Sequence, residues 1–241
     1  MEDVILKVDD LDFFYGDFHA LHDISMEIPK GKIVSIIGSN GAGKSTLLNA
    51  IVGINKSSKG TVTFCGEDIT NMRTNKIVAK GITLSPEGSG VFEDMSIKEN
   101  LLMGAFLPTP RKNRSANMEK VFSLFPILKE KENQLATFLS GGQRQMLAIA
   151  RAIMSEPQVL ICDEISLGLA PVVVKDIYKS IQEINSSGMT IVLVEQEVKR
   201  SLQYSDYSYV MVKGRIVMEG GSSTLPEDEV KDAYLGINKY A

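Results

Sequence analysis

The feature that most constrains the fold is a glycine-rich segment that follows an apolar run. The run is Ile33–Ile37, whose nearly continuous apolar character is typical of a strand buried on both faces of a sheet. The segment after it consists of Gly38, Ser39, Asn40, Gly41, Ala42, Gly43, Lys44 and Ser45. It fits G-x-x-x-x-G-K-[ST], in which backbone N–H groups surround a phosphate and the next helix adds its positive dipole end. The sequence therefore predicts a phosphate-binding loop; a glycine-rich turn without a ligand is the alternative.

Three side chains at the end of this segment have expected roles. The Lys44 ammonium can reach the β- and γ-phosphates of a nucleotide, and the Ser45 hydroxyl can ligate Mg²⁺. Thr46, the next residue, completes the expected phosphate-binding set. Without a nucleotide, we expect the Lys44 side chain to be solvated.

A pair of acids follows a second apolar run. Asp163 and Glu164 come directly after Val159–Cys162, so both carboxylates are expected at the end of a buried strand, where open α/β sheets bind ligands. Asp163 is placed to organise Mg²⁺, directly or through water. Glu164 is placed to accept a proton from an attacking water. The alternative is a pair of acids that caps a loop.

A third element precedes a helical stretch. Its residues are Leu139, Ser140, Gly141, Gly142 and Gln143. Ser140 can cap the helix that follows, and the two glycines leave its backbone N–H groups open, which predicts a second anion site at a helix N-terminus. A capped helix with no ligand is the alternative.

Composition excludes several classes of protein. The chain has 241 residues, 44% hydrophobic and 23% charged, with 26 Lys+Arg against 30 Asp+Glu. This is ordinary globular composition, and its mildly acidic balance argues against a nucleic-acid binder. Cys65 and Cys162 lie in apolar runs, which favours a reducing compartment. The only histidines, His19 and His22, exclude most zinc sites and any Ser-His-Asp set with a later histidine.

We expect neither a signal peptide at the start of this sequence nor a membrane span. Its start, Met1-Glu2-Asp3, is acidic where a signal peptide is basic, and no stretch approaches the roughly 18 apolar residues that span a bilayer. We expect a soluble chain whose membrane association goes through a partner.

The patterning predicts alternating strands and helices. Ile24, Met26 and Ile28 alternate with polar residues, as in a half-buried strand, and Ile191–Val194 is a further buried run. Apolar residues at helical spacing lie between Pro171 and Gly188; they are Val174, Ile177, Tyr178, Ile181 and Ile184. Residues 95 to 156 contain no convincing strand and predict a helical region, interrupted by a loop at Pro108–Arg114.

Together the three elements resemble the ATP-binding-cassette (ABC) ATPases. Gly38–Ser45 resembles their Walker A loop, Val159–Glu164 their Walker B strand and Leu139–Gln143 their signature sequence. The resemblance implies an α/β P-loop NTPase fold: a mainly parallel sheet flanked by helices, an N-terminal antiparallel β region and a helical subdomain. It implies one cassette over 1–241, with a catalytic core at 1–94 and 157–241 and the helical subdomain at 95–156.

The resemblance also assigns residues to a site for ATP and Mg²⁺. In this family two cassettes pair head to tail, so Leu139–Gln143 would act on the ATP of the partner. Tyr15 matches the aromatic residue that stacks on adenine; the alternative is a core aromatic beside Phe13 and Phe14.

Finer features resemble the LivF-type subunit of branched-chain amino-acid importers. Glu87 stands where most cassettes carry the Q-loop glutamine, which implies metal and permease coupling, and Gln196 stands where most carry the switch histidine that contacts the γ-phosphate. Ala170 replaces the usual D-loop aspartate, and the ending Gly214–Gly236 also fits. Ile165 departs from the usual proline.

The resemblance implies an ATPase subunit at the cytoplasmic face of the cell membrane. Its partners would be a second cassette, identical or a sibling, two transmembrane permeases and, indirectly, an extracytoplasmic solute-binding protein. Related urea or short-amide importers are alternatives. A soluble ABC protein of DNA repair or translation is disfavoured because the chain has no coiled-coil insert or tandem cassette. A small P-loop GTPase or kinase is disfavoured because no Asn-Lys-x-Asp motif occurs and the signature sequence would be unexplained.

Overall fold

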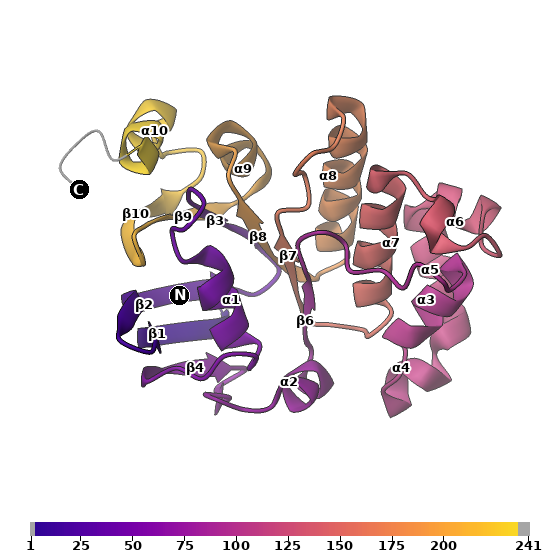
Figure 1. Cartoon of the computed structure of the whole chain (residues 1–241), viewed down its shortest axis with the longest axis horizontal. Helices are drawn as coiled ribbons and strands as arrows, with labels where there is room; N and C mark the ends of the chain where they lie inside the picture. The colour runs from indigo at the N-terminus through magenta and orange to yellow at the C-terminus, as the bar shows by residue number, and fades with distance from the viewer. Residues whose placement is uncertain (1–2, 236–241) are drawn as a thin grey trace. The chain divides into compact units, whose positions relative to one another are not determined.

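The computed structural model describes residues 3–235, and Figure 1 shows their arrangement. Residues 1–2 and 236–241 lie outside this range; three of them, Met1, Glu2 and Gly236, were used in the sequence analysis. The described chain divides into two compact units, one of residues 3–77 and 190–235 and the other of residues 78–189. Within these residues, no helix is long and apolar enough to cross a membrane.

The strands of the first unit form two groups. They are β1 (Val4–Tyr15), β2 (Phe18–Pro29), β3 (Ile33–Ile37), β4 (Lys59–Phe64), β5 (Glu67–Asp68), β8 (Thr190–Glu195), β9 (Tyr207–Val212) and β10 (Arg215–Gly221). The first group is antiparallel in the order β2-β1-β4-β5, which matches the expected N-terminal β region. In the second group β3 pairs in parallel with β8 and β9, and β10 pairs antiparallel with β9.

The sequence predictions for these strands are confirmed. All five residues of Ile33–Ile37 are buried, and Ile24, Met26 and Ile28 are the buried positions of their alternating stretch. Helices α1 (Lys44–Ile51), α9 (Val198–Tyr204) and α10 (Glu227–Leu235) belong to this unit. Apolar residues of α9 and α10 pack with β3 and β9; the buried members are Ile37, Val198, Val210, Val230 and Ala233.

The second unit combines two strands with a set of helices. Strands β6 (Ile82–Ser85) and β7 (Val159–Asp163) pair in parallel. The helices are α3 (Ile97–Gly104), α4 (Pro108–Lys112), α5 (Arg114–Leu124), α6 (Pro126–Glu130), α7 (Gly141–Ile153) and α8 (Pro171–Ser186), with a 3₁₀ turn η1 at Ala136–Phe138. Helix α2 (Thr74–Lys80) lies at the boundary of the units. Figure 1 shows α3 to α7 grouped together, and every element named between residues 95 and 156 is helical.

Helix α8 matches its predicted amphipathic pattern. The five apolar residues of the pattern are all buried, Pro171 is the first residue of the helix, and Gly188 follows its end with a φ of 96°. Proline fits there because a first-turn N–H has no partner in the helix, and glycine fits because only it adopts a positive φ without strain.

The predicted loop at Pro108–Arg114 is wrong for most of its length. Pro108–Lys112 forms the short helix α4, and Arg114 begins α5. The Leu107 carbonyl accepts the Arg111 N–H at 2.9 Å, which closes the turn. The two prolines, Pro108 and Pro110, occupy the first turn, where the missing N–H groups would have no partner in any case. Two prolines in three residues therefore indicated a helix start rather than a loop.

Candidate active site

In the Gly38–Ser45 segment, Gly38–Gly43 forms a tight loop after β3, as predicted, and Lys44 and Ser45 begin α1. The Ala42 N–H donates to the Ser39 carbonyl at 3.1 Å, and Gly43, which precedes α1, has a φ of 101°. A Cβ added at Gly38 would lie 2.7 Å from the Met211 carbonyl oxygen and 2.9 Å from Ala42 Cβ. Glycine is therefore needed at 38 for close backbone packing and at 43 for its left-handed conformation.

The N-terminus of α1 is suited to an anion. Gly43 has no side chain, and no side chain caps the helix. The first-turn N–H groups and the positive dipole end therefore favour a negative charge at this position. Ser45, in that first turn, is exposed. The loop thus has the cradle, and Ser45 the hydroxyl, that a nucleotide phosphate and its Mg²⁺ require.

The Lys44 side chain is not solvated, contrary to the sequence expectation. It is only 4% exposed, and its Nζ donates to the carbonyl oxygens of Gly38 at 2.8 Å and Ser39 at 3.1 Å. A buried ammonium must be hydrogen-bonded, and the inward-facing carbonyls of this tight loop supply the acceptors. When a phosphate binds, the Lys44 ammonium would therefore exchange these carbonyl acceptors for phosphate oxygens, and it already lies in the loop before binding.

Tyr15 lies beside this loop and is not a core residue. Its side chain is 51% exposed, whereas Phe13, which it contacts edge-on at 4.7 Å between ring centroids, is 6% exposed. The Tyr15 hydroxyl lies 3.4 Å from Thr46 Oγ1 and accepts a hydrogen bond from Asn55 at 3.2 Å. The alternative of a buried core aromatic is therefore wrong, and an accessible ring lies next to the first turn of α1.

Gln196 also lies near the loop, although it is distant in sequence. It follows β8, whose last residue Glu195 pairs in register with Ile37. The Glu195 carbonyl accepts the Gly38 N–H at 3.3 Å, which ties the end of β8 to the first residue of the loop. The parallel pairing of β3 and β8 thus brings Gln196 and Gly38 to the same end of the sheet.

The second unit carries the acidic residues. Asp163 ends β7 and is 6% exposed; Glu164 follows at 8% exposed with a φ of 49°. A left-handed conformation is uncommon for glutamate, and such positions occur at sharp turns that aim a side chain. In register, Ser85 of β6 pairs with Cys162, so both strands end at the same edge.

Glu87 lies on an exposed turn after β6. The three residues that follow it all have positive φ; they are Gly88, Ser89 and Gly90. Ser89 is buried, with 7% of its surface exposed. The Arg151 guanidinium donates to the Gly90 carbonyl at 2.8 Å. Glu87 is therefore exposed to solvent, while Arg151 of α7 holds the end of the turn at Gly90.

Two residues that hold this turn and the segment after it were missed by the sequence analysis. Asn100 is fully buried; it accepts the Phe92 N–H at 2.9 Å and donates to the Phe92, Met95 and Ser96 carbonyls. Arg151 lies 5.1 Å above the Phe92 ring, and burial lowers its pKa. The only signal in the sequence was a polar residue at an apolar position of α3.

The signature segment begins α7, as predicted. Ser140 Oγ accepts the Gln143 N–H at 3.3 Å, and Gln143 Oε1 accepts the Ser140 N–H at 3.2 Å, which is a capping box. Ser140 and Gly141 are exposed, and Leu139 is buried. A Cβ at Gly142 would lie 2.3 Å from Val173 Cγ1, so this glycine is required by packing against α8.

The predicted site residues thus fall into two groups. The loop Gly38–Thr46, Tyr15 and Gln196 lie together in the first unit. Glu87, Leu139–Gln143, Asp163 and Glu164 belong to the second unit.

Comparison with known proteins places the chain in a family. Residues 21–166 match the family described as ABC transporter. The high-affinity branched-chain amino acid transport ATP-binding protein BraG of Pseudomonas aeruginosa is 44% identical over 96% of this chain and 100% of its own length. The probable branched-chain amino acid transport ATP-binding protein LivF of Archaeoglobus fulgidus is 34% identical over 93% of this chain and 95% of its own.

Solved structures give the same result. One is the crystal structure of an ATP-binding cassette of an ABC transporter in its ADP conformation. Its sequence is 32% identical to this chain, and the two structures match with a TM-score of 0.81 over 96% of this chain and 95% of that one. A nucleotide-free cassette from an ABC transporter, also 32% identical, has a TM-score of 0.79.

The fold and the Gly38–Ser45 loop define a P-loop ATPase cassette, and the chain belongs to the ABC transporter family. Within that family it is an ABC ATPase of the LivF type. The predicted fold class and the relationship to branched-chain amino-acid transport ATPases are both confirmed.

Proposed function

We propose that this chain binds and hydrolyses ATP as the cassette subunit of an importer for branched-chain amino acids. The observation that carries the proposal is the identity of 44% with BraG over nearly the whole of both chains. The complete phosphate cradle, with Lys44 already buried and bonded to its own loop, supports nucleotide binding. Related urea or short-amide import is the alternative for the solute.

Each residue of the first unit would have one task. The first-turn N–H groups of α1 and the Lys44 ammonium bind the β- and γ-phosphates. The exposed ring of Tyr15 stacks on adenine. Gln196, at the end of β8, donates an amide hydrogen bond to the γ-phosphate and, unlike histidine, stays uncharged near neutral pH.

The acids of the second unit would complete the reaction. Glu164 accepts the proton of the attacking water, because a carboxylate positioned at a sharp turn can act as a general base. The hydroxyl of Ser45 and the carboxylates of Asp163 and Glu87 are hard oxygen donors, which are the ligands that Mg²⁺ prefers. Bound there, Mg²⁺ would neutralise the negative charge that develops on the phosphates.

The signature segment would act on a second cassette. Ser140 and Gly141 are exposed at the N-terminus of α7, where an anion is stabilised. Two cassettes, identical or siblings, would each place this segment against the ATP on the Gly38–Ser45 loop of the other. Closure would then depend on ATP and reopening on its hydrolysis.

A groove of about 240 Å³ in the second unit would receive a permease segment. Phe92, Met103 and Phe106 line it and are each about half exposed, and Arg151 lies among them. Such an apolar patch with one cation suits an amphipathic helix of a membrane protein. Two permeases would hold the subunit at the cytoplasmic face of the membrane and transmit closure to solute delivered by an extracytoplasmic binding protein.

Reconstitution tests the proposal. The chain is assembled in vesicles with a sibling cassette and a candidate permease pair, and ATP-driven uptake is measured for leucine, isoleucine, valine and urea. We expect uptake of the three amino acids, stopped by Glu164→Gln. Uptake of urea alone would favour the alternative solute class. ATP hydrolysis that never responds to any permease would refute the importer role.

A further inference from the structure

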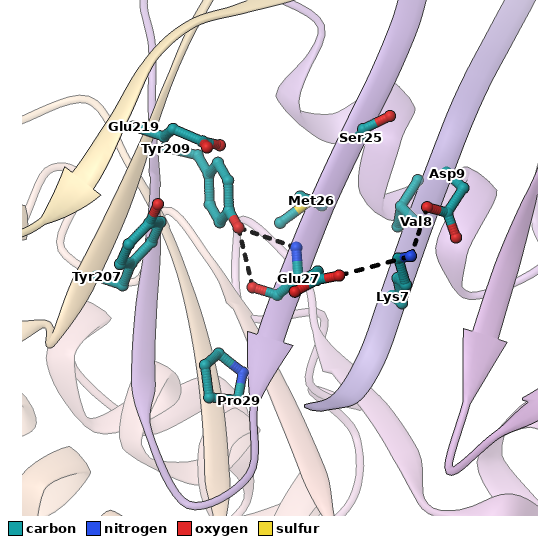
Figure 2. Close-up of a pocket in the computed structure, with 10 residues that line it drawn as sticks. All are labelled: Lys7, Val8, Asp9, Ser25, Met26, Glu27, Pro29, Tyr207, Tyr209 and Glu219. Carbon is teal, nitrogen blue, oxygen red and sulfur yellow. Dashed lines mark hydrogen bonds and ion pairs between the residues drawn. The ribbon is translucent and has the colours of Figure 1, made fainter. Parts of the chain in front are cut away.

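A second cavity, of about 400 Å³, lies in the first unit and includes no residue of the Gly38–Ser45 loop. Figure 2 shows its lining: Lys7, Val8, Asp9, Ser25, Met26, Glu27, Pro29, Tyr207, Tyr209 and Glu219. One side comes from β1 and β2 and the other from β9 and β10. Its volume is within the range of small-molecule sites.

Two tyrosine rings form one wall of the cavity. The Tyr209 hydroxyl accepts the Glu27 N–H at 2.9 Å and donates to the Glu27 carbonyl at 3.0 Å, so the ring is held in one position. The Tyr207 ring lies beside it, with 5.2 Å between centroids and a tilt of 58°. Figure 2 shows Glu219 next to the Tyr209 ring, in agreement with their pairing in the β9–β10 register. The wall is therefore aromatic and flanked by a carboxylate. Tyr209 is only 4% exposed, so most of the accessible ring surface belongs to Tyr207.

The lining carries excess negative charge. Three carboxylates, of Asp9, Glu27 and Glu219, face one ammonium, that of Lys7. Lys7 is engaged by Asp9 at 2.9 Å and Glu27 at 3.5 Å. Among residues 3–235, Glu219 forms no ion pair. The cavity thus has one carboxylate whose charge is not balanced by a neighbour.

The negative charge affects the pKa of both tyrosines. Burial, with Glu219 and Glu27 beside it, raises the pKa of Tyr207. Burial, with a further contribution from Glu219, raises the pKa of Tyr209 to about 12. Both phenols are therefore neutral at physiological pH, and their rings keep the electron-rich faces that attract cations.

The lining discriminates between kinds of ligand. An anion would meet three carboxylates and a lysine that is already paired. In the described part of the chain no three acidic or histidine side chains come together as a metal site requires. An organic cation needs no such convergence, because it is larger than a metal ion and can contact rings and a carboxylate together. We propose that this cavity binds a small alkylammonium compound, with Glu219 as its counter-ion and Tyr207 and Tyr209 as its aromatic wall.

The site has a direct structural link to the phosphate loop. Tyr209 lies on β9 and pairs in register with Ile36 of β3, the strand that leads into Gly38. A ligand against Tyr209 therefore contacts the strand next to the one that positions the loop.

Titration of the full chain by NMR tests the proposal with choline and butylammonium as probes. The neutral isostere of choline, 3,3-dimethylbutan-1-ol, serves as the uncharged comparison. We expect saturable shifts of the Tyr207 and Tyr209 ring resonances, with a dissociation constant of about 1 mM for choline and no saturation by the alcohol. Equal binding of the alcohol, or no saturable ring shift with either cation, would overturn the proposal.

Two variants and a control complete the test. Glu219→Gln removes the counter-ion and keeps its size, so choline should bind about fivefold more weakly. Tyr207→Leu removes one ring and should weaken binding by a similar factor of about five. Glu229→Gln removes an exposed glutamate of α10 that does not line the cavity and should change nothing. Melting temperatures verify that each variant folds. Unchanged affinity in folded Glu219→Gln would refute the role of that carboxylate and with it the site.

Discussion

Two helices of the second unit, α3 and α7, begin with the same motif but use it differently. Both are closed by a capping box, Ser96 with Glu99 in α3 and Ser140 with Gln143 in α7. In α3 the Ser96 hydroxyl accepts the Glu99 N–H at 3.2 Å and also donates to the Glu99 carboxylate at 2.7 Å. In α7 the Ser140 hydroxyl accepts the Gln143 N–H, and within the described chain its hydrogen has no acceptor.

The difference separates a structural cap from one suited to a ligand. Glu99 uses the hydroxyl hydrogen of Ser96 and puts a negative charge at the helix start. Gln143 closes the box with a neutral amide and leaves the hydrogen of Ser140 for another acceptor. Gly141 adds an exposed turn without a side chain. The α7 start can therefore keep its cap and donate to a phosphate at the same time, which the α3 start cannot.

The largest expected effect comes from removing the proposed general base, Glu164, and the resulting variant can be used to compare the two caps. Glu164→Gln removes the base and keeps its size, so turnover should fall by about 10²–10⁴-fold while ATP still binds. Because hydrolysis no longer separates the pair, the variant should accumulate as an ATP-bound dimer, measured by light scattering. Adding Ser140→Ala to it should weaken this dimer, whereas adding Ser96→Ala should not. Near-normal turnover of Glu164→Gln in the assembled complex would remove Glu164 from this role.

Lys44→Ala tests the other anion site, the Gly38–Ser45 loop, all of whose residues belong to the first unit. The change deletes a cation that can donate to the β- and γ-phosphates, so MgATP affinity should fall by about 10–100-fold, the value of a hydrogen bond to a charged group. Stability should also fall, by about 1 kcal/mol, because the Gly38 and Ser39 carbonyls lose their buried donor. Calorimetry and thermal melts measure the two effects, with exposed Lys30→Ala as control. Unchanged MgATP affinity would argue against a nucleotide site here.

Gln143→Glu would convert the α7 cap into the α3 kind. The new carboxylate can take the Ser140 hydroxyl hydrogen and would face the phosphate of the partner cassette, so turnover should fall by about tenfold. Helix stability should be unchanged or slightly higher, because an acid in the first turn favours the helix dipole. Steady-state ATPase and thermal melts measure the two outcomes. Full turnover would mean that no phosphate approaches this helix.

The sequence predicted the elements of this site better than their local chemistry. Motif spacing and apolar runs were enough to predict the loop before α1, the acids after β7 and the cap of Ser140, because each of these features depends on residues that are close in sequence. The buried state of Lys44 depends on carbonyls that turn inward only when the loop closes. The roles of Asn100 and Arg151 depend on contacts between α3, α7 and the Glu87 turn. Such contacts across elements leave no periodic pattern, so they could not be predicted.

The smallest expected effect compares the two caps directly. Ser96→Ala and Ser140→Ala each remove a cap and should each cost about 1 kcal/mol of stability. Only Ser140→Ala should also lower turnover, because only that hydroxyl can serve a phosphate. The measurements are the free energy of unfolding in urea and the ATPase rate at several protein concentrations. Equal losses of turnover in the two variants would mean that Ser140 acts only as a cap.

The pH dependence of these two losses of stability should differ as well. Hydrogen bonds from Ser96 hold the pKa of Glu99 below its ordinary value. The resulting stabilisation is fully present above the pKa of the unfolded chain and is lost as the pH falls through the lowered pKa of the folded one. The cost of Ser96→Ala should therefore shrink in acid, whereas Gln143 does not titrate and the cost of Ser140→Ala should stay constant. Urea unfolding of both variants from neutral to acidic pH measures this, and parallel curves would show that the two boxes do not differ in charge.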